Sequence, residues 1–191
     1  RSKRIEEIGN YPGYTLEVAR SATDSDGYIK DVQLDFVELR LGNVCNVACR
    51  TCNPASSSKW RNDYDKLQNK LTFDITSYDT IEGFRWPERE EFWEDLLQHC
   101  DNVKTFYING GEPTLIKQHF KFLQRLADMG RTDVKLWYNN NMTNMNEDII
   151  DIWRQFDHVK VSCSIDDLGE RNEYIRYPTK WDDVMRNFLR L

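Results

Sequence analysis

Residues 34–52 read LDFVELRLGNVCNVACRTC, a strand-like run that leads directly into a cysteine-rich loop. Over 34–41, aliphatic residues alternate with charged or aromatic ones, which predicts a β-strand with one apolar face. A short loop with several thiols at the end of a strand indicates a site for a metal or a metal cluster. The loop holds three of the chain's five cysteines, which are Cys45, Cys49 and Cys52.

The alternation over 34–41 recurs in later segments, and helical patterns separate them. Strands that alternate with helices are typical of βα units on a parallel sheet. Strands are expected at 34–41, 103–109, 133–139 and 159–165. Helices are expected at 56–67, 88–99, 114–129, 146–156 and 181–191.

Each expected strand has an aliphatic face and a mixed, partly polar face. In the third strand, for example, Leu136 and Tyr138 flank Trp137. A sheet between two layers of helices favours continuous apolar runs, whereas a sheet that curves into a barrel needs helices only on its outer face. We therefore predict an α/β fold, a partial (β/α) TIM-like barrel of parallel strands with outer helices, over residues 34–191. Residues 1–33 are expected to form an N-terminal extension, for which the sequence has no clear pattern.

The composition suits one globular domain in a reducing compartment. The chain has 191 residues, 39% of them hydrophobic and 13% aromatic, and a formal net charge of −6. A weakly acidic chain with scattered basic residues carries no electrostatic signal for nucleic acid or an anionic membrane. No apolar run approaches the roughly 20 residues of a membrane span, and the first residues lack the apolar stretch of a signal peptide. An odd number of cysteines, most of them clustered, argues against a secreted disulfide framework and favours a cytoplasmic protein.

Polar residues follow each expected strand at its carboxyl end. The cysteine loop follows the first strand, residues 109–113 the second, 139–141 the third and 164–166 the fourth. In βα barrels the carboxyl ends of the strands form one face, where functional residues gather. The sequence therefore predicts that these four segments converge on one site.

The cysteine loop has more than one interpretation. A structural zinc site needs four ligands. The two remaining cysteines are poorly placed to supply the fourth, because Cys100 precedes a strand and the alternation over 159–165 places Cys163 on the aliphatic face. None of the three histidines follows a strand. Three thiolates without a fourth suit an iron–sulfur cluster that has one open iron. Zinc binding stays open as an alternative, and so do two other functions, a non-catalytic iron–sulfur or zinc module that binds a partner and an electron-transfer protein.

Two motifs, in this order and at these strand ends, resemble a known superfamily. The spacing C-X3-C-X2-C over 45–52 and the sequence GGEP over 110–113 together resemble the radical S-adenosylmethionine (radical SAM) superfamily. Segment 164–184 further resembles members that carry a twitch or SPASM domain. The resemblance implies that the three cysteines hold a [4Fe–4S] cluster whose fourth iron chelates SAM. It also implies reductive cleavage of SAM to a 5′-deoxyadenosyl radical, which takes a hydrogen atom from a substrate.

The resemblance implies roles for further residues in binding SAM. At Gly110 and Gly111, the missing Cβ lets the backbone approach the methionine part of SAM. Glu112 accepts a hydrogen bond from the ammonium group, or is only an acidic residue in the first turn of a helix. Ser164 contacts the ribose or the carboxylate, and Arg176 reaches the carboxylate or forms a surface salt bridge. Asn139, which its parity places on the mixed face, binds the ribose or the substrate, or forms a turn.

The resemblance also implies partners. Cleavage of SAM at a cluster needs a reductant such as flavodoxin or ferredoxin. By analogy with twitch and SPASM members the substrate is a peptide or protein, with a nucleotide-like small molecule as the alternative. The superfamily core has six βα units and four are recognisable here. The last units and any twitch or SPASM domain are therefore expected to lie in a missing C-terminal segment or to be replaced by a partner.

Overall fold

A computed structural model describes part of the chain as two compact units, Arg1–Leu34 and Asp35–Leu191. The described residues are 15–29, 34–67, 70 and 85–191. In the first unit, helix α2 (Leu16–Ser21) begins after Thr15, whose hydroxyl oxygen accepts a hydrogen bond from the Val18 amide at 3.2 Å. The sequence analysis found no pattern for this helix, because its six residues form no buried face.

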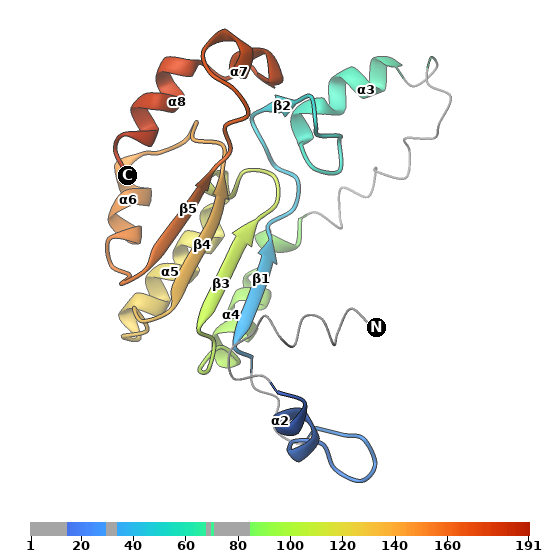
Figure 1. The fold of residues 1–191 in the computed structure, drawn as a ribbon, viewed down its shortest axis with the longest axis vertical. Coiled ribbons are helices and arrows are strands. Elements are labelled where there is room, and N and C mark those ends of the chain that lie inside the picture. The colour runs from blue at the N-terminus through green and yellow to red at the C-terminus, as the bar shows by residue number, and fades with distance from the viewer. Residues whose placement is uncertain (1–14, 30–33, 68–69, 71–84) are drawn as a thin grey trace. The chain divides into compact units, whose positions relative to one another are not determined.

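The second unit is built on one sheet of four strands (Figure 1). All neighbouring strands are parallel, and each overlaps one of the predicted strands. The predicted parallel α/β arrangement is thereby confirmed. The strands in their order across the sheet are β1 (Phe36–Arg40), β3 (Thr105–Asn109), β4 (Lys135–Asn140) and β5 (Val159–Cys163).

Helices connect the strands, and a two-residue antiparallel pair forms a second, smaller sheet. The helices in the described part of this unit are η1 (Ser58–Trp60), α3 (Arg61–Leu67), η5 (Trp86–Glu88), α4 (Glu90–Gln98), η6 (Pro113–Leu115), α5 (Lys117–Asp128), α6 (Glu147–Trp153), α7 (Glu170–Ile175) and α8 (Trp181–Phe188). The small sheet pairs β2 (Ala48–Cys49) with β6 (Arg176–Tyr177). The sequence analysis did not predict α7, β2 or β6.

The helix predicted over 114–129 is two helices in the structure. Ile116 has an extended backbone (φ −98°, ψ 102°) and separates η6 from α5. The side chain of Glu112 caps η6, and Pro113 occupies its first turn. The α5 helix ends where predicted, because Gly130 adopts a positive φ of 76°.

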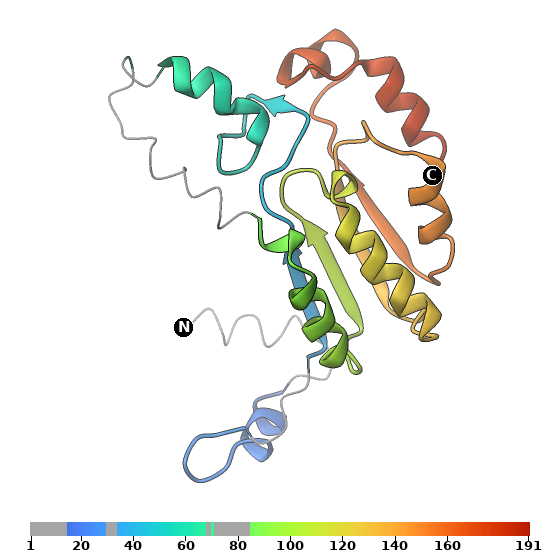
Figure 2. The ribbon, with the colours of Figure 1, turned by 180° about the vertical axis from the view of Figure 1, so that it is seen from behind.

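Helices α4, α5 and α6 cover one face of the sheet (Figure 2). The residues on the aliphatic face of each strand point into this layer. There the rings of Phe106 and Phe122 meet edge to face at 5.2 Å, and those of Tyr138 and Trp153 lie 4.8 Å apart. His119 of α5 is fully buried here, with its Nδ1 atom 2.6 Å from the Ile116 carbonyl oxygen. This layer is the hydrophobic core of the unit.

The mixed face of the sheet is open to solvent along β4 and β5. Lys135, Trp137 and Asn139 are exposed, whereas Leu136, Tyr138 and Asn140 between them are buried. The predicted division into an aliphatic and a mixed face is therefore confirmed. Within the described residues the strands form an open sheet with β1 and β5 at its edges, so the barrel itself is not confirmed.

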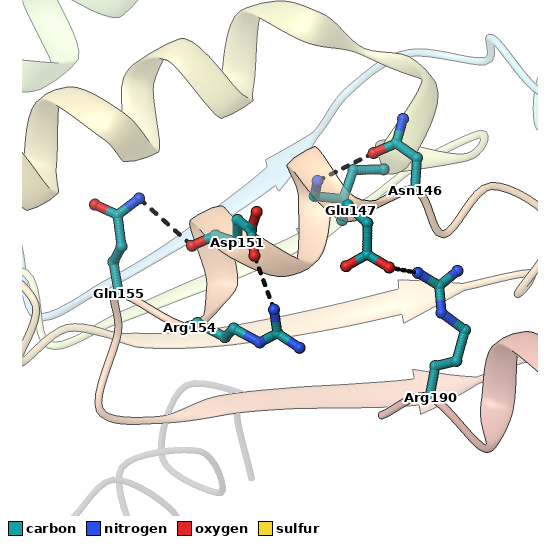
Figure 3. A network of polar contacts seen from close by, with 7 residues as sticks. Asn146, Glu147, Asp151, Arg154, Gln155 and Arg190 are labelled. Atoms are coloured by element: carbon teal, nitrogen blue, oxygen red, sulfur yellow. Dashed lines mark hydrogen bonds and ion pairs between the residues drawn. The ribbon is translucent and has the colours of Figure 1, made fainter.

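A network of polar contacts fastens the end of the described chain to α6 (Figure 3). Asn146 caps α6 by accepting a hydrogen bond from the Ile149 amide at 3.0 Å. Arg190, just after α8, donates to the carboxylate of Glu147 and to the Met145 carbonyl oxygen. These contacts hold α8 against the start of α6.

Every helix in the described part of the chain is too short or too polar to cross a lipid bilayer.

Candidate functional site

The segments that follow β1, β3, β4 and β5 converge on one cavity of about 520 Å³. All of the residues that the sequence analysis assigned to a site line this cavity. They are Cys45, Cys49, Cys52, Gly110, Gly111, Glu112, Asn139, Ser164 and Arg176. The predicted convergence follows from the parallel sheet, because the carboxyl ends of its strands share one edge.

The end of β3 holds the start of the cysteine loop in place. The Leu41 amide donates to the Asn109 carbonyl oxygen at 2.8 Å, and the Glu112 amide donates to the Val44 carbonyl oxygen at 2.8 Å. These two bonds bring the loop backbone against the glycine pair after β3.

The structure gives a reason of its own for the glycine pair, besides the one expected. Gly110 and Gly111 have positive φ values of 86° and 56°. A Cβ on Gly111 would lie 2.3 Å from the Val44 carbonyl oxygen, and one on Gly110 would lie 3.0 Å from the Gly42 carbonyl oxygen. The missing side chains therefore make room for the protein's own cysteine loop. That they also let SAM approach stays a prediction.

The segment after the loop supports it from another side. The hydroxyl of Ser57 donates to the Val47 carbonyl oxygen at 2.6 Å, and the indole N–H of Trp60 donates to the Cys49 carbonyl oxygen at 2.8 Å. The Cys45 amide donates to the Ser58 hydroxyl at 3.2 Å. The predicted helix at 56–67 thus helps to fix the path of the loop.

A third contact comes from the chain after β5. Cys49 and Arg176 lie opposite each other where β2 pairs with β6. The Arg50 amide donates to the Ile175 carbonyl oxygen at 2.9 Å, and the Arg50 guanidinium lies 3.7 Å from the centre of the Tyr174 ring. This pairing joins residues that are far apart in the sequence and brings a cation to the cysteines.

Two of the cysteines affect each other's pKa. The pKa of Cys52 is lowered to about 6, mainly because the Cys49 thiol donates a hydrogen bond to it. The same bond, together with burial, raises the pKa of Cys49. Burial raises the pKa of Cys45. Within this loop, one thiol therefore helps to stabilise the thiolate of another.

Hydrogen-bond donors from distant segments face two of the sulfurs. Arg176 Nη1 lies 3.6 Å from Cys49 Sγ, and Asn141 Nδ2 lies 3.8 Å from Cys45 Sγ. The Arg176 Nε atom is also 2.8 Å from a carboxylate oxygen of Asp166. The positive charge of Arg176 thus lies between a carboxylate and the cysteine loop.

The three cysteine sulfurs are not arranged around a position for a single metal ion. In the described residues, no group of three or more His, Cys, Asp or Glu side chains is arranged to hold a metal ion. The remaining cysteines lie outside the cavity. Cys100 is buried in the hydrophobic core, and Cys163 packs against that core from β5. Both placements agree with the sequence analysis.

Glu112 is 1% exposed and is held by four donors. Its Oε1 atom accepts from the amide and hydroxyl of Thr114, at 3.1 and 2.6 Å, and from the Asn140 side chain at 2.7 Å. Its Oε2 atom accepts from the Asn141 amide at 2.7 Å. Burial raises the pKa of this carboxyl group, and the hydrogen bonds oppose that shift. Because each carboxylate oxygen has about two acceptor sites, Oε2 keeps one for a further donor.

Asn139 of β4 and Ser164, just after β5, line the cavity. The Asn139 side chain donates to the Tyr107 hydroxyl at 2.7 Å. The Ser164 amide donates to the Asn140 carbonyl oxygen at 2.8 Å, which fixes the backbone after β5. Both residues lie on the mixed face, as their parity predicted.

Asn141 is a functional candidate to which the sequence analysis gave no role of its own, although it placed segment 139–141 at the site. It contacts Cys45 and Glu112 at once, and its side chain also donates to the Asn46 side chain at 3.0 Å. The sequence pattern could have pointed to it, because Asn141 is two residues after Asn139 and side chains two apart along a strand point to the same face. Other unassigned residues that line the cavity are Glu38, Arg40, Ser56, Tyr107 and Asn109.

A scan against models of protein families finds no match to this chain, and a search of curated proteins finds none either.

Proposed function

We propose that this chain is the core of a radical SAM enzyme. The observation that carries the proposal is the cavity, where three cysteines of one loop meet Glu112 after β3, Ser164 after β5 and Arg176 of β6. A zinc or electron-transfer module needs the cysteines but gives no reason for these other residues. The enzyme interpretation gives each of them a ligand group to bind.

The residues around the cavity fit an iron–sulfur cluster. Thiolates are the ligands that such clusters take, and each iron takes one thiolate. Three sulfurs therefore need not meet at one ion position, and with three of them one iron stays open. N–H groups near the sulfurs, as from Asn141 and Arg176, are typical of cluster sites. Cys45, Cys49 and Cys52 would hold the cluster.

When bound, the reduced cluster supplies the electron that splits SAM into methionine and a radical able to take hydrogen from a substrate. The chain's own residues bind and orient. The free acceptor site of Glu112 Oε2 suits the ammonium group of SAM, and Arg176 brings the positive charge that suits its carboxylate. Ser164 and Asn139 offer hydroxyl and amide groups for the ribose.

We also infer that the sheet is part of a (β/α) barrel whose interior is the mixed face. Two features support this. Parallel sheets are normally covered on both faces, yet here the mixed face is exposed. Next to the edge strand β5 lies a groove of about 520 Å³, lined by Arg154, Arg190 and otherwise apolar residues of β5, α6 and the end of the described chain. Further βα units, from a longer chain or a partner, would cover both.

The direct test is product formation under anoxic conditions. The protein is reconstituted with iron and sulfide, reduced in the presence of SAM, and analysed for 5′-deoxyadenosine by chromatography. The proposal predicts that product forms and that Cys49→Ala abolishes both cluster loading and product. Cys163→Ala is the matched control, because this sulfur lies outside the cavity, and it should retain both. A fully loaded, reduced cluster that yields no product would contradict the enzyme proposal.

A further inference from the structure

The mixed face of the sheet continues the cavity away from the cysteines. Rows of side chains run across the sheet, because neighbouring strands are in register. Asn109 and Asn139 line the cavity. The next row lies about 7 Å further along the strands, since two residues rise roughly 3.3 Å each. That row consists of Glu38 and Tyr107, which also line the cavity, and of Trp137 and Lys160, which lie beyond it.

This face is positively charged in a chain that is acidic overall. Glu38 and Arg40 neutralise each other through an ion pair at 2.8 Å, which leaves Lys135 and Lys160. Neither lysine has a carboxylate oxygen within 4 Å among the residues that the structure describes. The whole chain has a formal net charge of −6, so two unpaired cations on adjacent strands are a local excess.

Between these lysines lies an exposed aromatic side chain. Trp137 is 39% exposed, although it is in the middle of a parallel sheet. Lys160 Nζ lies 5.2 Å from the centre of its ring, within the range of a cation–π contact. Phe36 meets the same ring edge to face at 6.2 Å. The row therefore offers a flat apolar surface with ammonium groups beside it.

We propose that this face binds the substrate and selects one that carries an anionic group next to a flat or apolar group. The inference rests on the proposed function, in which the reacting part of the substrate lies at the cavity. The anionic group then lies near Lys160, one row and about 7 Å from the reacting carbon, with Lys135 one row further along the strands. A glutamate or aspartate of a peptide and the phosphate of a nucleotide both meet this description.

Two matched probes test the charge preference with the full chain. 2-Naphthoate and 2-naphthylmethylammonium share a ring and differ in the sign of their charge. Binding is followed by the fluorescence of the protein and by the amide spectrum of the labelled protein. We expect naphthoate to bind about tenfold more tightly, and Lys135→Gln or Lys160→Gln to weaken it by about threefold each, the scale of one exposed ion pair. Trp137→Ala should weaken both probes.

The control variant is Lys121→Gln, which removes an exposed lysine of α5, on the covered side of the sheet. It should leave both affinities unchanged. Equal affinity of the two probes, or naphthoate binding that neither lysine substitution at the mixed face affects, would overturn the inference. Thermal unfolding of each variant shows whether a change in affinity follows from a loss of folding.

Competition then distinguishes the two sources of the anionic group. A capped hexapeptide with two glutamates and adenosine 5′-monophosphate are each tested for displacement of naphthoate. Displacement by the peptide assigns a carboxylate substrate, and displacement by the nucleotide assigns a phosphate. Displacement by neither contradicts the inference. Iron content and 5′-deoxyadenosine are measured separately, so a protein that binds naphthoate as expected but holds no cluster would refute only the proposed function.

Discussion

Arg176 and Cys49 face each other across the pairing of β2 with β6, and Arg176 Nη1 lies 3.6 Å from the cysteine sulfur. The guanidinium is also paired with the Asp166 carboxylate at 2.8 Å, so it is held in place from both sides. A fixed positive charge beside a cluster ligand favours the state with the extra electron, because that state is the more negative one.

Replacing Arg176 should therefore make a cluster at this site harder to reduce. In Arg176→Gln we expect the midpoint potential to fall by at least about 59 mV, a tenfold change for a one-electron couple. The measurement is a redox titration followed by electron paramagnetic resonance. Arg171→Gln is the control, because Arg171 lies in α7 and pairs with Asp167 at the surface. An unchanged potential in Arg176→Gln would show that the 3.6 Å contact has no electrostatic effect on the cluster.

Glu112→Gln tests the assignment of the SAM ammonium group. The substitution keeps the size and one acceptor oxygen but removes the negative charge. We expect SAM binding to weaken by roughly 1.5–3 kcal/mol, the scale of a hydrogen bond to a charged group. Methylthioadenosine, which has no ammonium group, should bind both proteins alike. Equal weakening for the two ligands would mean that Glu112 acts only through the structure of the loop.

Gly111→Ala tests the finding that the glycine pair accommodates the cysteine loop. The new Cβ would meet the Val44 carbonyl oxygen, so the loop must move. Gly130→Ala is the matched control, because Gly130 also has a positive φ but nothing lies within 4 Å of the added Cβ. Both variants carry backbone strain of about 1–3 kcal/mol.

Urea unfolding and iron content separate the two effects of the glycine substitutions. Gly111→Ala should lose more free energy of unfolding than Gly130→Ala, and it alone should lose iron after reconstitution. Equal losses in the two variants would mean that the collision with Val44 is relieved at no cost.

His119 should make stability depend on pH. Burial lowers the pKa of this side chain to about 3 from its ordinary value of 6.5. The unfolded chain then binds a proton that the folded one does not, so the free energy of unfolding falls as pH drops below 6.5, by about 1.4 kcal/mol per pH unit. The raised pKa of buried Glu112 acts in the opposite direction, so the comparison must be made with a variant.

His119→Phe isolates this effect. Urea unfolding at several pH values between 6 and 4.5 should give a shallower fall of stability in this variant than in the original protein. His158→Gln, at an exposed position, should keep the original slope. The same slope in His119→Phe would assign the acid sensitivity to other groups.

The parallel sheet and the convergence of the site were predictable from sequence because burial leaves a periodic pattern. Leu136 and Tyr138 face the core while Trp137 and Asn139 face solvent, and the alternation of residue types records this directly. Once the strands are parallel, the position of Glu112 and Ser164 near the cysteines follows from topology. This is why the predicted residues at these strand ends line one cavity.

The contacts that fix the cysteine loop were not predictable in the same way. β2 and β6 have two residues each, which is too short for any periodicity, so no pattern paired Arg176 with Cys49, and only the family resemblance placed Arg176 at the site. The steric reason for the glycine pair depends on how closely Val44 approaches Gly111, which is a property of the folded loop. The four donors to Glu112 likewise come from two strand ends that meet only in the fold.

The measurement that tests the cofactor assignment most directly is Mössbauer spectroscopy of the full chain, reconstituted anoxically with ⁵⁷Fe. We predict the signals of a [4Fe–4S] cluster, with one iron that changes its parameters when SAM is added, because three cysteines leave that iron without a protein thiolate. Spectra that contain no such cluster, or a cluster whose irons are all unaffected by SAM, would contradict the account.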